Sequence, residues 1–201
     1  GSAFRLAGEF LCAAWHCSIM NAFLFREDEP MANVTYDKNC LTVLDHPLVG
    51  HKMTILRDES TAPAHFRKLV HELAALEAYE ATRDLPTMQV QVKTPICETE
   101  GVRLKDDTLA VVPILRAGMG MLEGVLSVVP SAAVGVLGME RDEETHEPHS
   151  YYAKMPQGIE NRMALVIDPM LATGGSALAA IKYLREAGVK DIRLLVMAGL
   201  P

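Results

Sequence analysis

The segment at residues 168–176, DPMLATGGS, places one carboxylate ahead of two glycines and two hydroxyl side chains. It follows the apolar run MALVID and precedes a helical pattern, so we expect a turn between a buried strand and a helix. Backbone N–H groups at a helix start bind anions, and glycines at 174 and 175 let the backbone approach a phosphate. Thr173 and Ser176 can donate hydroxyl hydrogen bonds to the same phosphate. Asp168 would repel a phosphate, which assigns it to ribose hydroxyls or to a bound magnesium ion.

A simpler interpretation of this segment is a capped helix after a tight turn, with Asp168 as a structural hydrogen-bond acceptor. TGGS alone would favour that interpretation. The succession of strand, acid, turn and helix instead favours a phosphate-binding turn, because parallel sheets bind ligands where their strands end.

A second turn, PILRAGMG at 113–120, sets Arg116 between the end of a strand pattern and the start of a helical one. A guanidinium in this position can hold a phosphate or diphosphate by two parallel hydrogen bonds. The alternative is a dinucleotide-binding fold, since GMGMLEG approximates GxGxxG and Glu140 ends the next strand as a ribose-binding acid would. The pattern has one residue too many before its third glycine, and it leaves TGGS unexplained.

The stretch GMERDEETHEPHSYYAKMPQ, residues 138–157, is charged and rich in turn formers. It indicates a hairpin or a mobile arm between two strands, with most of its charges solvated. Arg141 follows the strand directly, so we select it as the residue that reaches a ligand. His146 and His149 have a spacing found in metal sites, but no third ligand accompanies them and we predict no metal site there.

Four apolar runs predict buried strands, and helical patterns separate them. The predicted strands are 108–115, 132–139, 163–168 and 191–200, and the predicted helices are 60–83, 121–129 and a segment from about Gly175 to a cap at Gly188. Ser60 or Thr61 can cap the first helix, with Pro63 in its first turn. Continuous apolar strands that alternate with helices predict an α/β fold with a parallel sheet covered on both faces.

Composition narrows the classes of partner. The chain has 201 residues, 49% of them hydrophobic, and a formal net charge of −7, which predicts one domain and argues against nucleic acid as a bulk electrostatic partner. The four cysteines, at 12, 17, 40 and 97, lack paired spacing and fit reduced thiols in the cytoplasm. The apolar stretch at 10–25 is short for a membrane span and is interrupted by polar residues. We expect residues 1–30 to be an extension or a cloning remnant outside the fold.

Taken together, these segments resemble the type I phosphoribosyltransferases, and within them the uracil phosphoribosyltransferases. The resemblance is carried by VDPMLATGGS, with Pro169 in place of the second acid of the wider family, and by HPLVGHKMTILRDEST, YEATRDLP, VVPILRAGMGM and DEETHEPHSYYAKMP in the same order. It runs from about Tyr36 to Pro201. It implies a parallel sheet with flanking helices, a small hood and a β-arm.

The resemblance also implies transfer of a phosphoribosyl group from phosphoribosyl diphosphate (PRPP) to uracil in pyrimidine salvage, with Mg²⁺ bound mainly through PRPP. Asp168 would bind the ribose hydroxyls, and residues 172–176 the 5′-phosphate. Arg116 and Arg141 would bind the diphosphate. The full set expected to contact PRPP is Arg116, Arg141, Asp168, Pro169, Met170, Leu171, Ala172, Thr173, Gly174, Gly175 and Ser176. GTP activation and assembly into a homo-oligomer are further properties that the resemblance suggests.

Members of that family continue past AGLP at 198–201, through a segment resembling GYIVPGLGDAGDR that recognises uracil. We therefore expect residues 31–201 to form a phosphoribosyltransferase domain that lacks the uracil-binding segment. Besides the salvage enzyme, this leaves a catalytically impaired protein that binds PRPP or another subunit. A dinucleotide oxidoreductase and a nucleic-acid-binding regulator are more distant alternatives.

Overall fold

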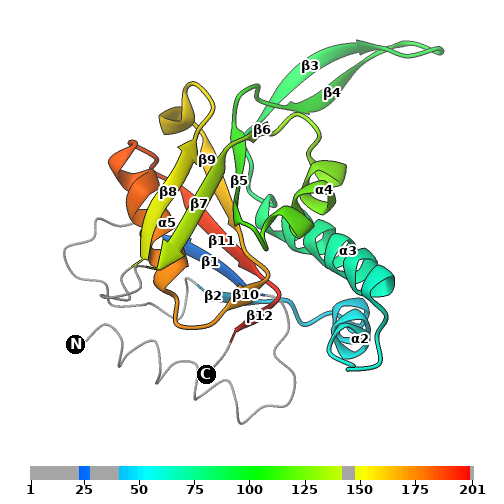
Figure 1. Cartoon of the computed structure of the whole chain (residues 1–201). Coiled ribbons are helices and arrows are strands. Elements are labelled where there is room, and N and C mark those ends of the chain that lie inside the picture. The colour runs from blue at the N-terminus through cyan, green and yellow to red at the C-terminus, as the bar shows by residue number, and fades with distance from the viewer. Residues whose placement is uncertain (1–22, 28–40, 142–147, 200–201) are drawn as a thin grey trace.

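One mixed sheet forms the centre of the molecule in the computed structural model, which describes residues 23–27, 41–141 and 148–199 (Figure 1). Its strands follow the order β2 (Leu41–Val43), β1 (Phe23–Glu27), β11 (Ile192–Val196), β9 (Met163–Ile167), β5 (Leu109–Leu115), β7 (Val136–Arg141) and β8 (Pro148–Lys154). The short strand β6 (Ala133–Val134) also pairs with β5. Strands β11, β9, β5 and β7 are parallel, whereas β1, β2 and β8 add antiparallel edges. The predicted parallel sheet is confirmed.

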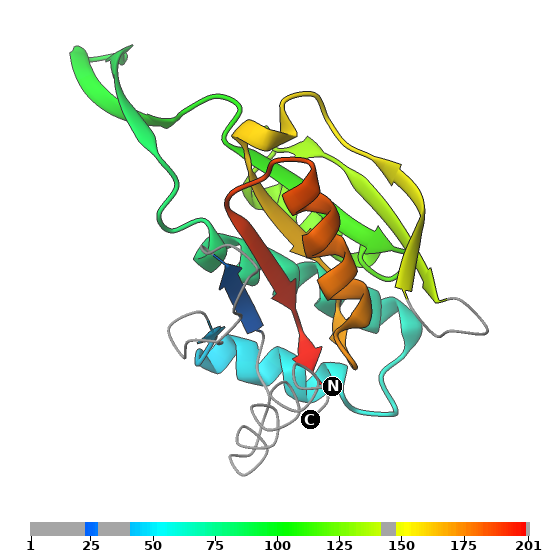
Figure 2. The same cartoon turned by 90° about the vertical axis from the view of Figure 1, so that its left-hand side faces the viewer.

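Helices cover both faces of this sheet (Figures 1 and 2). Helices α2 (Pro47–Leu56), α3 (Pro63–Ala81) and α4 (Met119–Val128) lie over one face, and α5 (Gly175–Glu186) lies over the other. Two hydrophobic clusters fill the layers, one under α2 to α4 and one under α5. All five residues of β9 and of β11 are buried, which explains why these strands are apolar throughout except at Arg193.

Several predicted boundaries shift in the structure. Ala62, not Ser60 or Thr61, is the N-cap residue of α3. The Ser60 hydroxyl donates to the Asp58 carboxylate at 2.6 Å, and the Thr61 hydroxyl donates to the Ile55 carbonyl at 2.5 Å, so both are engaged in the preceding turn. The predicted strand 132–139 is divided into β6 and β7. Gly188 follows α5 with φ of 89°, as expected for the residue after a helix end.

Some elements were not predicted. Helix α2 begins after His46, whose Nδ1 accepts a hydrogen bond from the Leu48 N–H at 3.1 Å. Strands β3 (Thr87–Lys93) and β4 (Glu98–Leu104) form a hairpin that projects from the body (Figures 1 and 2). The alternation in TMQVQVK is the pattern that could have revealed it. Strand β1 falls within residues 1–30, which we expected to lie outside the fold. It nevertheless pairs with β11 over five residues, so at least this strand belongs to the sheet. A short 3₁₀ helix, η2 (Ile159–Asn161), precedes β9.

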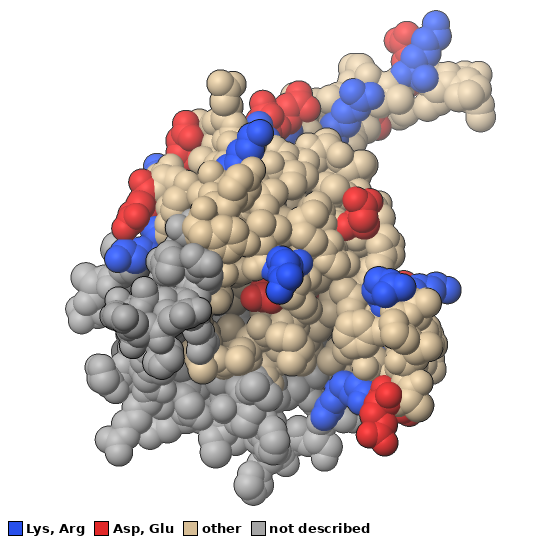
Figure 3. Space-filling model, in the orientation of Figure 1, with Lys and Arg blue, Asp and Glu red and all other residues tan. Residues whose placement is uncertain are grey.

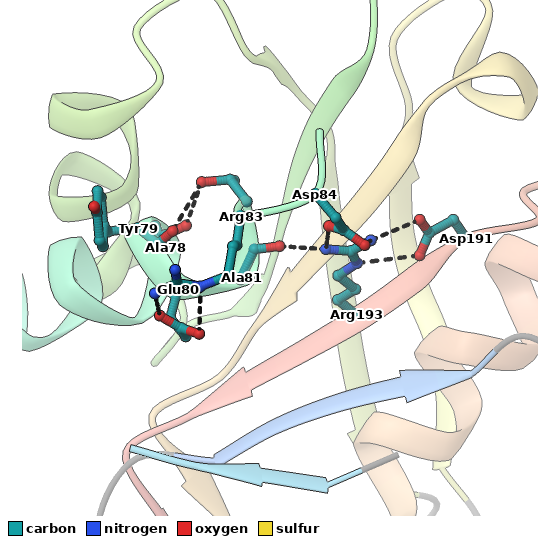
Figure 4. A network of polar contacts seen from close by, with 9 residues as sticks. Ala78, Tyr79, Glu80, Ala81, Arg83, Asp84, Asp191 and Arg193 are labelled. Atoms are coloured by element: carbon teal, nitrogen blue, oxygen red, sulfur yellow. Dashed lines mark hydrogen bonds and ion pairs between the residues drawn. The ribbon is translucent and has the colours of Figure 1, made fainter. Parts of the chain in front are cut away.

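A buried arginine ties β11 to the end of α3 (Figure 4). Arg193 is 4% exposed, and its guanidinium donates to both oxygens of Asp84, at 2.6 and 3.1 Å. It also donates to both oxygens of Asp191, at 3.2 and 3.0 Å, and to the Ala81 carbonyl. All three guanidinium nitrogens are therefore bonded, which a buried cation requires.

Glu77 of α3 is also buried but, unlike Arg193, its charged group is not hydrogen-bonded within the described residues. Its side chain is 3% exposed, and neither carboxylate oxygen has a hydrogen-bond partner among the residues that the structure describes. Burial raises the pKa of this carboxyl well above its ordinary value. Glu77 is therefore protonated at neutral pH or imposes a cost on the folded state.

Candidate functional site

The candidate site is built from the carboxyl ends of the parallel strands. Asp168 follows the last residue of β9, and its N–H donates to the Leu195 carbonyl of β11 at 3.2 Å. Its carboxylate accepts a weak hydrogen bond from the Met170 N–H at 3.5 Å. Burial raises the pKa of Asp168 from 3.8 to about 6, against the opposing effect of the Met170 N–H. Above pH 7 the group is therefore ionised but incompletely solvated, a state that hydroxyl donors of a ligand would stabilise.

The turn after Asp168 opens onto the start of α5. Gly174 has φ of 76° in the left-handed region, a conformation that side-chain-bearing residues rarely adopt, and α5 begins at Gly175. The first helical hydrogen bond joins the Leu178 N–H to the Gly174 carbonyl at 2.9 Å. The N–H groups of residues 175–177 thus have no carbonyl acceptor within the helix. The predicted helix start at Gly175 is confirmed, and its role in binding an anion stays a prediction.

An open pocket of about 350 Å³, solvent included, lies over this turn. The residues that line it are Asp168, Met170, Leu171, Ala172, Thr173, Gly174, Gly175, Ser176, Ala177 and Val196. Asp168 is the only charged residue among them. Ala177 and Val196 were not predicted; Val196 ends β11, so its place at a strand terminus could have identified it. Pro169 was predicted as a binding residue but is not among the lining residues.

The Arg116 turn lies against the same strand ends. Arg116 is exposed and follows β5, which is the neighbour of β9 in the sheet, and the Leu115–Arg116 peptide bond is cis. Gly118 is buried in this turn, and a Cβ there would lie 2.3 Å from the Ile167 carbonyl oxygen. Ile167 immediately precedes Asp168. Glycine at 118 is therefore what brings the Arg116 turn into contact with the strand that carries Asp168.

Arg141 is the last residue of β7 and pairs with Pro148 of β8. Strand β7 pairs with β5 at Leu115 and Gly138, so Arg141 lies three residues beyond the level at which the Arg116 turn begins. The predicted hairpin in residues 138–157 is confirmed by the antiparallel pairing of β7 and β8. Residues 142–147, which include His146, lie outside the described residues, and the role of Arg141 stays a prediction.

Two further properties concern the described part of the chain. No group of three or more His, Cys, Asp and Glu residues there could hold a metal ion. None of the helices described there has the length and apolar character needed to cross a membrane.

A parallel sheet with helices on both faces, an acid at a strand end and a glycine turn that opens a helix define a protein of the type I phosphoribosyltransferase class. The model of the uracil phosphoribosyltransferase family matches residues 43–200, and the chain belongs to this family. A dinucleotide-binding fold is thereby excluded.

Curated relatives and a solved structure agree with this assignment. The chain is 52% identical over 158 residues to a uracil phosphoribosyltransferase of Clostridium beijerinckii, covering 79% of this chain and 76% of that protein. It is 53% identical over 161 residues to one of Finegoldia magna, covering 80% and 77%. The solved structure of the AQ2163 protein from Aquifex aeolicus is 38% identical, with a TM-score of 0.69 over 74% of this chain and 71% of that one.

Proposed function

We propose that the protein transfers the phosphoribosyl group of PRPP to uracil, giving UMP and diphosphate. The bond between ribose C1 and the diphosphate oxygen breaks, a bond to a uracil ring nitrogen forms, and that nitrogen loses a proton. The observation that carries the proposal is the pocket at the start of α5, where Asp168 and the Gly174 turn face one open space. The names of the relatives support uracil as the acceptor.

In this proposal the pocket binds the phosphoribosyl end of PRPP. The N–H groups at the start of α5 and the hydroxyls of Thr173 and Ser176 bind the 5′-phosphate. Asp168 accepts hydrogen bonds from the ribose hydroxyls. Its partial burial supports this role, because an incompletely solvated carboxylate gains more from a hydroxyl donor than a fully hydrated one does.

We assign the departing diphosphate to Arg116 and Arg141. Loss of diphosphate leaves a cation-like ribose ring, so stabilising the leaving anion lowers the barrier. Arg116 lies on a turn held against Ile167 through Gly118, which supports a fixed position beside the pocket. For Arg141 the support is its place at the end of β7, the neighbour of β5.

We propose that a magnesium ion arrives with the substrate and takes few ligands from the protein. Mg²⁺ in nucleotide sites is held by one or two carboxylates together with phosphate oxygens and water. Asp168 is the only acid among the lining residues, so it could supply one ligand, while PRPP would supply the others. The ion would neutralise diphosphate charge.

We further propose that the protein is a homo-oligomer. The β3–β4 hairpin projects from the body, and Met88, Ile96, Val102 and Leu104 on it are 41–94% exposed. An isolated two-stranded hairpin is marginally stable in water, so a second copy that covers it would stabilise it. On the face of the body seen in Figure 3, broad areas without charged side chains surround a basic and an acidic group near the centre, which also favours a protein contact.

Sedimentation of the wild type and of an Ile96→Glu, Val102→Glu double variant tests the oligomer. We expect the double variant to be a monomer, whereas Gln91→Lys, at an exposed position opposite Glu100 in the same hairpin, should leave the assembly unchanged. A wild-type monomer would contradict the proposal. GTP as an effector and a cytoplasmic location remain proposals that rest on the family and on the cysteine pattern; assays with and without GTP, and cell fractionation, test them.

Conversion of labelled uracil to UMP, with PRPP and Mg²⁺, tests the catalytic proposal. Cytosine and hypoxanthine serve as competing bases, Asp168→Asn as the inactive variant, and Asp58→Asn, on the surface, as the matched control. Turnover that is selective for uracil and lost only in Asp168→Asn supports the proposal. Folded wild-type protein without turnover would contradict it, and retained binding of PRPP would then favour the catalytically impaired PRPP-binding protein.

A further inference from the structure

The turn that carries Asp168 is held by the chain that follows β11. Strand β10 (Met170–Leu171) pairs in parallel with β12 (Ala198–Gly199). The Pro169 carbonyl accepts hydrogen bonds from the N–H groups of both Met197 and Ala198, each at 3.2 Å. These contacts join two segments that lie almost thirty residues apart in the sequence.

Asp168 lies between two fixed peptide groups. On its N-terminal side its own N–H donates to the Leu195 carbonyl at 3.2 Å, and on its C-terminal side the Pro169 carbonyl is held by Met197 and Ala198. Both attachments reach the same stretch of backbone, residues 195–198. The backbone that carries the Asp168 carboxylate is therefore held on both sides by main-chain hydrogen bonds, which do not involve a ligand.

The supporting segment is itself fixed in the core. Met197 is 1% exposed and packs in the hydrophobic cluster under α2 to α4, while Val196 lines the pocket. On the other strand of the pair, Leu171 packs against the cluster under α5, and its Cδ1 lies 4.0 Å from where a Cβ of Gly174 would be. The support thus extends from the core to the glycine turn at the start of α5.

We propose that Met197 and Ala198 are positioning residues. Their backbone N–H groups fix Asp168 and the glycine turn at the start of α5 without touching the substrate. The proposal rests on the phosphoribosyl-binding role given to this pocket above. Preorganised groups avoid a reorganisation cost on binding, and a displacement of about 1 Å can reduce activity on the order of 100-fold. Residues that bear no functional side chain would thus set the affinity for the ribose phosphate.

The test compares Ala198→Pro, which removes one of the two N–H donors, with Ala198→Ser, which keeps it. We expect Ala198→Pro to raise the KM for PRPP about tenfold or more, with the KM for uracil changed less than about twofold. Ala198→Ser should behave as the wild type. Amide exchange at Met170 and Leu171 should be faster in Ala198→Pro than in Ala198→Ser. Equal PRPP KM values and equal exchange in the two variants would overturn the proposal.

Amide exchange in the wild type provides a second measurement that needs neither turnover nor a folded proline variant. The Met197 and Ala198 amides should be protected, and protection at Asp168, Met170 and Leu171 should increase when ribose 5-phosphate is added. Unprotected Met197 and Ala198 amides would overturn the proposal. If the wild type fails to convert uracil while these exchange results hold, the catalytic proposal falls and the positioning role stands.

Discussion

Replacing Asp168 by asparagine is expected to stabilise the fold at pH 8 and to abolish turnover. Burial raises the pKa of this carboxyl from 3.8 to about 6, so the folded protein disfavours the ionised form. The sign follows from proton linkage. Between pH 4 and 6 the folded state binds more protons at this group than the unfolded state does, so the group's contribution to stability falls as pH rises through this window. Asparagine carries no charge and avoids that loss.

The size of the effect follows from the same displacement of the pKa. A change from 3.8 to about 6 corresponds to roughly 3 kcal/mol when the group is fully ionised. Asp168 is only partly buried, so solvent screening reduces this to about 1–2 kcal/mol. The asparagine amide oxygen can still accept the Met170 N–H, so no hydrogen bond need be lost.

Urea unfolding of wild type and Asp168→Asn, followed at intervals from pH 4 to pH 8, measures the prediction. The difference in unfolding free energy should be near zero at pH 4, grow through pH 6 and level off above pH 7. Asp58→Asn is the matched control: this exposed carboxyl has its pKa lowered by hydrogen bonds from Ser60, so it should show no gain at pH 8. An Asp168→Asn variant that is no more stable than the wild type at pH 8 would refute the reasoning.

Three other substitutions test buried contacts of the fold. Glu77→Met should stabilise the protein by about 1–3 kcal/mol at pH 8 and by less at pH 5, because it removes an unpartnered buried acid whose pKa is raised; denaturant unfolding at both pH values would show it. Arg193→Lys should cost about 2–4 kcal/mol, because an ammonium cannot make the bidentate contacts of the guanidinium, and an unchanged thermal midpoint would contradict this. Gly118→Ala should cost about 1–3 kcal/mol and reduce turnover, because its Cβ would meet the Ile167 carbonyl oxygen; circular dichroism melting and the uracil assay measure both.

The glycine turn at 173–176 could be predicted because its information is local. An acid after an apolar strand and two glycines before a helix identify both the strand end and the helix start, and the structure begins α5 at Gly175 as expected. The place of Arg116 between a strand end and a helix start was predicted in the same way, and its role stays a prediction. The strands of the projecting hairpin could have been found from the alternation in TMQVQVK, but the hairpin's direction away from the body could not, since β3 and β4 bury few side chains and contact little beyond each other.

By itself the sequence determined the parallel sheet, its flanking helices and the residues of the glycine turn, because strand and helix periods and glycine dihedrals are properties of short segments. Only the tertiary structure decided what holds that turn. The close approach of Gly118 to Ile167 and the two N–H groups that meet the Pro169 carbonyl join residues far apart in the chain. Such contacts depend on strand order and register, which no single stretch of sequence encodes.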